Sequence, residues 1–140
     1  MAEGLMNKLG GDRFEAFSAG SRPAGYVHTK AIDAMAAMGI DISRNESKSI
    51  DAFAGRLFNF VITVCDNAKE ECPIFPGEPI TAHWGFEDPA LVEGSEEYVN
   101  NEFRRIAFEI ERRIRLFLAI PEDKLSELDY LEAVRNVGNQ

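Results

Sequence analysis

Apolar side chains recur every three or four residues over residues 95–118, and this is the clearest periodic pattern in the chain. Such spacing gathers apolar side chains on one face of a helix. The stripe consists of Val99, Phe103, Ile106, Ala107, Ile110, Ile114, Phe117 and Leu118. Glu96 and Glu97 suit the positive end of a helix, and Pro121 cannot continue one. The pattern predicts one long amphipathic helix that packs on the rest of the fold.

Four shorter helices are expected around it. Gly10 and Gly11 end the first of them. Thr29 can cap the start of the second and Gly39 ends it, and Ser49 can cap the start of the third. Their expected ranges are 2–9, 29–38, 50–54 and 122–135. The last carries its apolar face on Leu125, Leu128, Leu131 and Val134.

Three segments have the composition of strands. Residues 58–65 are so densely apolar that we expect a strand buried on both faces. Residues 80–84 predict a weaker strand, and apolar and polar residues alternate over 14–18. Strands that alternate with helices favour a parallel sheet covered by helices on both faces. We therefore expect a single α/β domain over residues 1–140.

Composition narrows the class of protein. The chain is 45% hydrophobic and 28% charged, which is ordinary for a globular domain, and its longest apolar stretches fall far short of a membrane span. No basic-then-apolar leader opens it, so we expect a cytoplasmic location. The net charge of −9 disfavours nucleic-acid binding and attraction to anionic membranes. Any anion site must therefore be local.

Cys65 and Cys72 are the only cysteines, and a proline follows the second. On an intact helix seven positions correspond to a rise of about 10.5 Å, whereas a disulfide needs Cα atoms within about 7 Å. A bridge would therefore require residues 66–71, a weak helix, to unwind. Lys69 within that segment could favour a thiolate. The pattern suggests a redox-coupled switch, although spacing alone favours two thiols that form no bridge.

A zinc site of Cys65, Cys72 and His83 is a further alternative. The spacing departs from the usual zinc motifs, and a fourth ligand is not evident.

Several segments coincide, in order, with one family. They are Met1-Ala-Glu-Gly4, Ser18-Ala-Gly20, Gly39-Ile-Asp-Ile-Ser43, Ser47-Lys-Ser49, Val64-Cys-Asp-Asn-Ala-Lys-Glu-Glu-Cys-Pro73 and His83-Trp-Gly-Phe-Glu-Asp-Pro-Ala90. Together they resemble the thioredoxin-coupled arsenate reductases, which are built on the low-molecular-weight tyrosine phosphatase fold. The resemblance covers nearly the whole chain.

The resemblance implies a relay of three thiols that reduces arsenate to arsenite. In that family a nucleophilic cysteine in a Cys-x5-Arg loop attacks arsenate. A second cysteine, matched here by Cys65, then releases arsenite. A third, matched by Cys72, forms a Cys65–Cys72 disulfide bridge, which thioredoxin or a similar dithiol reductant opens. Asp88 matches the general acid. Most Asp-Pro pairs are only turns, so the assignment of Asp88 as the general acid depends on the resemblance alone. No metal or organic cofactor is implied.

One departure concerns an ion. Some members of the family bind potassium with a carboxylate at the position of Lys48. We expect the Lys48 ammonium to replace that cation and to steady the region of Glu3 and Ser18. The alternative, which has equal weight, is that Lys48 is a solvated loop lysine with no role in the site.

The larger departure is that these 140 residues contain no Cys-x5-Arg sequence. The resemblance implies that a central strand and this loop precede residue 1, and that the chain by itself is inactive. Three explanations stay open: a longer natural protein, a strand supplied by a swapped dimer, or a non-catalytic remnant. A low-molecular-weight tyrosine phosphatase and a redox-responsive interaction protein are the alternative functions.

Overall fold

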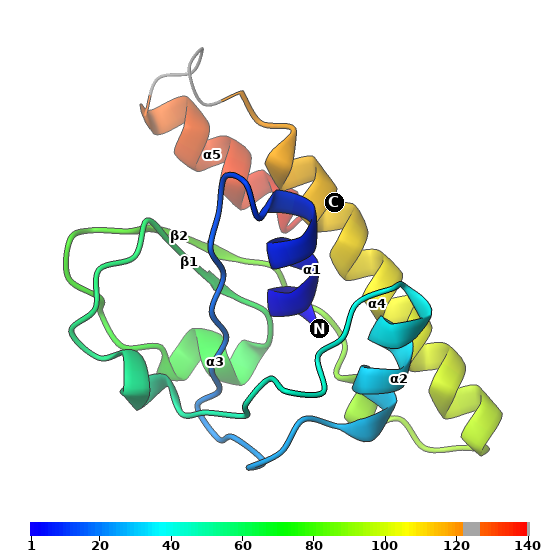
Figure 1. Cartoon of the computed structure of the whole chain (residues 1–140). Coiled ribbons are helices and arrows are strands. Elements are labelled where there is room, and N and C mark those ends of the chain that lie inside the picture. Colours follow the sequence, from blue (N-terminus) through cyan, green and yellow to red (C-terminus); the bar gives the residue numbers. More distant parts are fainter. Residues whose placement is uncertain (122–126, 140) are drawn as a thin grey trace.

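A computed structural model describes residues 1–121 and 127–139 (Figure 1). The helices are α1 (Ala2–Gly10), α2 (Thr29–Ala37), α3 (Asp66–Glu71), α4 (Glu96–Leu118) and α5 (Glu127–Val137). The strands are β1 (Phe60–Thr63) and β2 (Ile80–His83), and Ile50–Phe53 and Pro89–Leu91 form single 3₁₀ turns. No helix in the described part of the chain is both long and apolar enough to cross a bilayer.

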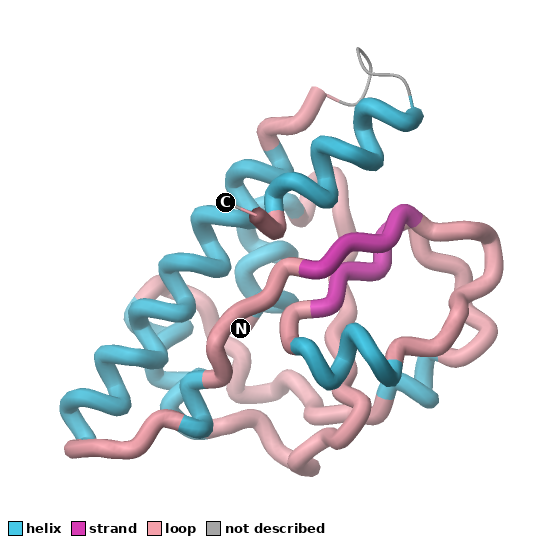
Figure 2. The backbone as a smooth tube through the Cα atoms, turned by 180° about the vertical axis from the view of Figure 1, so that it is seen from behind, coloured by secondary structure: helices cyan, strands magenta, loops and turns pink. Residues whose placement is uncertain are grey.

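The sheet confirms the expected parallel pairing. β1 and β2 run parallel, with Phe60 opposite Ile80 and Thr63 opposite His83. The crossover between them contains α3, as a parallel pair requires a long connection. In both ribbon views the strand pair lies between α5 and α3 (Figures 1 and 2). The fold is therefore α/β, with a parallel sheet and helices packed around it.

The long helix is the main support of the core. α1, α2 and α5 all pack against α4, and α5 also packs against β2 (Figure 1). The predicted apolar face of α4 is confirmed, and Ser95 caps its start by accepting a hydrogen bond from the Tyr98 amide. Its buried side chains are Phe103, Ile106, Ala107, Ile110, Ile114 and Phe117. They meet Leu5, Met35 and Ile42 from the N-terminal part of the chain.

The strand expected over 14–18 is absent, so that prediction was wrong. The segment is extended but pairs with no strand among the described residues. Asn7 of α1 takes the place of a partner, because its side-chain amide donates to the Ala16 carbonyl at 3.1 Å and accepts from the Ala16 amide at 2.8 Å. Alternation of side chains shows which face is apolar, but a strand also needs a neighbouring backbone.

Three smaller expectations also need correction. His28, rather than Thr29, caps α2, because its Nδ1 accepts a hydrogen bond from the Lys30 amide. All four residues of β1 are half-buried instead of buried on both faces, since β2 is the only strand paired with β1 in the described structure. The last helix is described over Glu127–Val137 and ends two residues later than expected, while residues 122–126, with Leu125, lie outside the described residues.

Candidate active site

Cys65 and Asp88 follow the two strands at the same edge of the sheet. Cys65 comes two residues after β1, and Asp88 lies five residues after β2. The carboxyl ends of parallel strands in open α/β sheets are where ligands commonly bind. The Phe86 amide donates to the Val64 carbonyl at 3.0 Å. This bond joins the residue before Cys65 to the segment that leads into Asp88, so the structure brings the two segments together.

The two thiols flank α3, as the spacing predicted. Asp66–Glu71 is helical, and the Lys69 amide donates to the Cys65 carbonyl at 3.1 Å (Figure 2). Cys65 is exposed, Cys72 is half-buried, and no disulfide joins them. With the helix intact, the rise between the two residues is about 10.5 Å. The structure is therefore a dithiol form in which a bridge cannot close without unwinding α3.

The environment of Cys72 favours the neutral thiol over the thiolate. Its partial burial raises the pKa of the Cys72 thiol, because an apolar surrounding disfavours the charged form. Three residues further on, Phe75 is buried and its ring meets that of Phe58 at 5.5 Å between centroids. This contact anchors the chain after Cys72 to the residues just before β1.

The raised pKa has a measurable consequence. In a Cys65→Ser variant, alkylation of Cys72 by iodoacetamide should increase with pH through a midpoint above that of an unburied thiol, because only the thiolate reacts. At neutral pH the reaction should be slower than in the urea-unfolded variant. Mass spectrometry of samples quenched over time measures both rates. A midpoint equal to that of the unfolded variant would contradict the burial argument.

Arginines of α4 hold the segment before Asp88. Arg105 donates to Glu87 at 2.8 Å and also to Glu102 on its own helix, and these bonds raise the pKa of Arg105 and lower the pKa of the Glu102 carboxyl. Arg113 donates to the Gly85 carbonyl at 2.8 Å. The exposed Asp88 accepts from the Ala90 amide at 2.9 Å, which caps a 3₁₀ turn. The structure thus shows Asp88 in a tethered turn.

Glu3 and Ser18 lie together, since the Ser18 hydroxyl donates to the Glu3 carboxylate. Lys48 enters the same region through its backbone, because its carbonyl accepts from the Gly20 amide at 3.0 Å. Its ammonium lies 5.6 Å from the centroid of the Phe53 ring. The structure therefore joins the segments that carry these three residues, and it places the Lys48 charge over an aromatic face.

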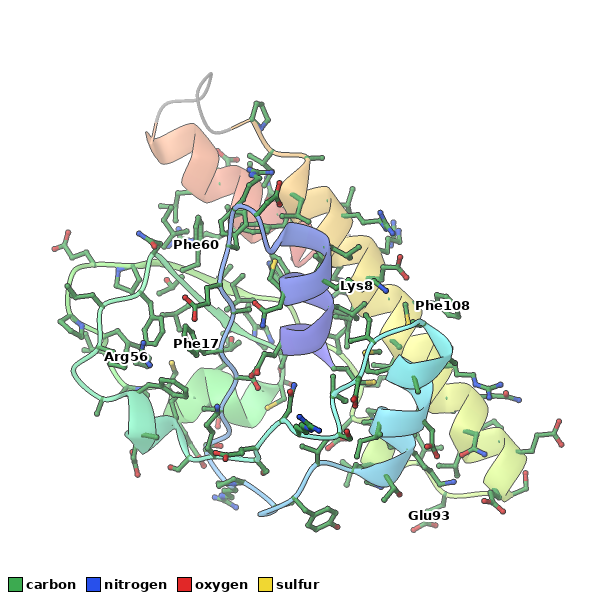
Figure 3. The ribbon with its side chains drawn as sticks, in the orientation of Figure 1. Lys8, Phe17, Arg56, Phe60, Glu93 and Phe108 are labelled. Atoms are coloured by element: carbon green, nitrogen blue, oxygen red, sulfur yellow. The ribbon has the colours of Figure 1, made fainter. Side chains whose placement is uncertain are left out.

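A cluster of three phenylalanines around one arginine was not predicted. The Arg56 guanidinium lies 4.8 Å from the centroid of Phe17 and 5.5 Å from those of Phe53 and Phe58 (Figure 3). Aromatic faces attract cations of this kind. The cluster links residue 17 to the chain before β1 without any strand pairing. Aromatic residues recurring in the sequence near Arg56 were the only available signal.

Sequence reasoning also missed the contacts of His83. Its Nδ1 lies 2.7 Å from Thr63 Oγ1, and its Nε2 lies 3.1 Å from Asp66 Oδ1. The strand register, which sets Thr63 opposite His83, is the signal that could have found the first contact. The zinc alternative is not supported, because Nε2 of His83, which could bind the metal, contacts the Asp66 carboxylate instead. Nowhere in the described ranges do three or more His, Cys, Asp or Glu side chains gather as a metal site requires.

Comparison with known proteins finds several relatives that are named arsenate reductases. A protein named arsenate reductase from Halalkalibacterium halodurans is 41% identical over 117 residues, which are 84% of each chain. The arsenate reductase of Bacillus subtilis is 38% identical over the same shares. A solved structure described as an arsenate reductase in oxidized state has a TM-score of 0.66 at 27% identity, covering 81% of this chain and 82% of that one.

A second solved structure, described as an arsenate reductase in the reduced state, has a TM-score of 0.64 at 26% identity and covers 84% of this chain and 85% of that one. The family described as low molecular weight phosphotyrosine protein phosphatase matches residues 1–129. That match spans the strand pair, α3 and both cysteines. The chain therefore belongs to the low molecular weight phosphotyrosine protein phosphatase family.

Proposed function

We propose that this chain is the relay part of an arsenate reductase, which reduces arsenate to arsenite and is recycled by thioredoxin. The observation that carries the proposal is the pair of thiols at the two ends of the six-residue α3. A phosphatase of this family has no need of such a pair. The relatives that share about 40% of the sequence are named arsenate reductases, which favours the same activity.

The relay balances in three exchanges. A cysteine of a Cys-x5-Arg segment outside these 140 residues displaces water from arsenate, and Asp88 protonates the departing oxygen. The Cys65 thiolate then attacks the sulfur of that cysteine, and arsenic leaves as arsenite with the electron pair of the As–S bond. The Cys72 thiolate attacks the Cys65 sulfur next, which frees the first thiol and leaves a Cys65–Cys72 bridge. A thioredoxin dithiol supplies two electrons and two protons to reopen it.

The geometry of α3 makes the third exchange a conformational step. Cys72 is half-buried and a full helix separates it from Cys65. Because a bridge needs Cα atoms within about 7 Å, α3 must open before or during the attack. Opening also carries the bridge toward solvent, where a protein reductant can reach it. Opening a helix this short costs little free energy, since most helical stability comes from tertiary packing.

Two supporting roles belong to the same proposal. Lys48 supplies the positive charge that a potassium ion supplies elsewhere in the family, and the Glu3–Ser18 pair steadies the adjoining segment. Thiols that cycle through a disulfide bridge are compatible with the reducing cytoplasm, which we propose as the location. A strand that completes the sheet beside β1 comes either from a longer chain or from a second copy.

The test couples arsenate reduction to NADPH oxidation through thioredoxin and thioredoxin reductase. The 140-residue chain alone should give no arsenate-dependent rate above background. The same chain extended at Met1 by a strand and a Cys-x5-Arg loop should turn over. Arsenate-dependent oxidation by the unextended chain would show a nucleophile other than the proposed one. An extended, folded protein that binds arsenate but does not reduce it would refute the activity.

A further inference from the structure

His83 connects the end of the sheet to the start of α3. Its ring lies between the Thr63 hydroxyl and the Asp66 carboxylate, at 2.7 and 3.1 Å. If the Thr63 hydroxyl donates to Nδ1, then Nε2–H donates to Asp66, and a single tautomer satisfies both contacts. Asp66 is the first residue of α3 and directly follows Cys65. The imidazole thus ties the sheet to the helix that must open.

We propose that His83 is a positioning residue that holds α3 in its helical, dithiol form and thereby sets the redox equilibrium of Cys65 and Cys72. This inference rests on the relay proposed above. An interaction present only in the dithiol form stabilises that form, so it makes the pair easier to reduce and raises its reduction potential. Weakening the interaction should lower the potential and speed bridge formation.

The sheet side of the contact is fixed. Thr63 and His83 face each other in the β1–β2 register, and the Thr63 hydroxyl lies 2.7 Å from Nδ1 of a ring that is only 23% exposed. The ring therefore has little freedom to follow Asp66. When α3 unwinds, the residue after Cys65 must change direction, and the Asp66 carboxylate leaves Nε2. The contact is for that reason absent from the bridged form.

The helix has a second tie at its other end. Arg22 donates to Glu71 at 3.1 Å, and Arg22 is 81% exposed. Asp66 is also exposed, at 93% of its side chain, so solvent screens its contact with His83. The expected effect is therefore modest: about a threefold change in the equilibrium between dithiol and bridge, which corresponds to about 14 mV for two electrons.

The experiment measures the potential of the Cys65–Cys72 pair in the 140-residue chain. Samples are equilibrated with mixtures of dithiothreitol and its cyclic disulfide, and free thiols are then alkylated and counted by mass. The Sγ–Sγ bond forms with loss of two protons, and the two electrons open the cyclic disulfide of the oxidant. The variants are Asp66→Ala, His83→Asn and His83→Gln, with Glu70→Ala as the control of equal charge change on α3 at an exposed position.

Asp66→Ala and His83→Asn should each lower the potential by about 14 mV, and the double variant should lower it no further, because both remove one contact. An asparagine amide replaces Nδ1 and keeps Thr63, whereas a glutamine amide replaces Nε2 and can still donate to Asp66. His83→Gln and Glu70→Ala should therefore match the parent. A purely structural role of His83 would not produce this split.

Two results would overturn the inference. Equal potentials in the parent and in Asp66→Ala would show that the contact does not bias the pair, and the relay would stand. A parent chain that forms no Cys65–Cys72 bridge at any mixing ratio would refute the relay and the inference together. Since Asp66 is exposed, its variant should fold, so the test does not depend on the stability of the His83 variants.

Discussion

Replacing Cys65 with serine should abolish thioredoxin-coupled arsenate reduction in the extended protein, with a loss of about 10³-fold or more. The proposed attack by Cys65 is intramolecular, and a well-oriented intramolecular group acts at effective concentrations of about 10⁵ M and above. Millimolar thiols in solution cannot replace it at that efficiency. NADPH oxidation with arsenate, thioredoxin and thioredoxin reductase measures the loss.

The same variant separates the two enzymes that this family could supply. Hydrolysis of an aryl phosphate needs the Cys-x5-Arg nucleophile but neither Cys65 nor Cys72, so the variant should keep whatever phosphatase activity its parent has. Cys72→Ser should also stop cycling, and it should trap a disulfide between Cys65 and the loop cysteine. Arsenate turnover that persisted in Cys65→Ser would contradict the relay. Phosphatase activity without arsenate reduction in the parent would favour a tyrosine phosphatase.

Phe117→Ala should destabilise the protein by about 3–5 kcal/mol, a large share of the usual stability of a domain. Phe117 is 2% exposed, and its ring meets those of Phe14, Phe60 and Trp84 at 5.1, 5.2 and 5.7 Å between centroids. It therefore joins α4 to β1, to the segment after β2 and to the chain that follows α1. Truncation leaves a cavity among rings that cannot all move inward.

Urea unfolding followed by circular dichroism measures that loss. Phe108→Ala is the matched control, because Phe108 lies on the same helix and is 60% exposed. The control should change the free energy of unfolding by less than about 0.5 kcal/mol. Similar losses in both variants would show that packing around Phe117 does not decide the result, because alanine is the better helix former at both positions.

Local patterns predicted most of the elements. The stripe of α4 lies on the face that the spacing indicated, and Ser49 caps the turn that follows it, as expected. The weak helix between Cys65 and Cys72 is present over the predicted residues. These features depend on neighbours a few positions apart, which a single sequence displays directly.

Long-range partners could not be predicted in the same way. Residues 14–18 alternate as a strand does, but the contact that holds them comes from Asn7, on the preceding helix. The contact between His83 and Asp66 could not be predicted, because the sequence does not show that Asp66 lies 3.1 Å from the His83 ring. In both cases a polar side chain bonds across a turn of the chain. Spacing and composition contain no information about such pairs.

The amide of Asn7 has a consequence for solubility. Extended backbone with open donors and acceptors is a template on which other molecules can add strands. Asn7 occupies both backbone groups of Ala16, and a side chain, unlike a strand, offers no continuation of the ladder. At Ala16, therefore, the backbone has no open donor or acceptor for a strand of another molecule, and Asn7 closes one point at which such a strand could add.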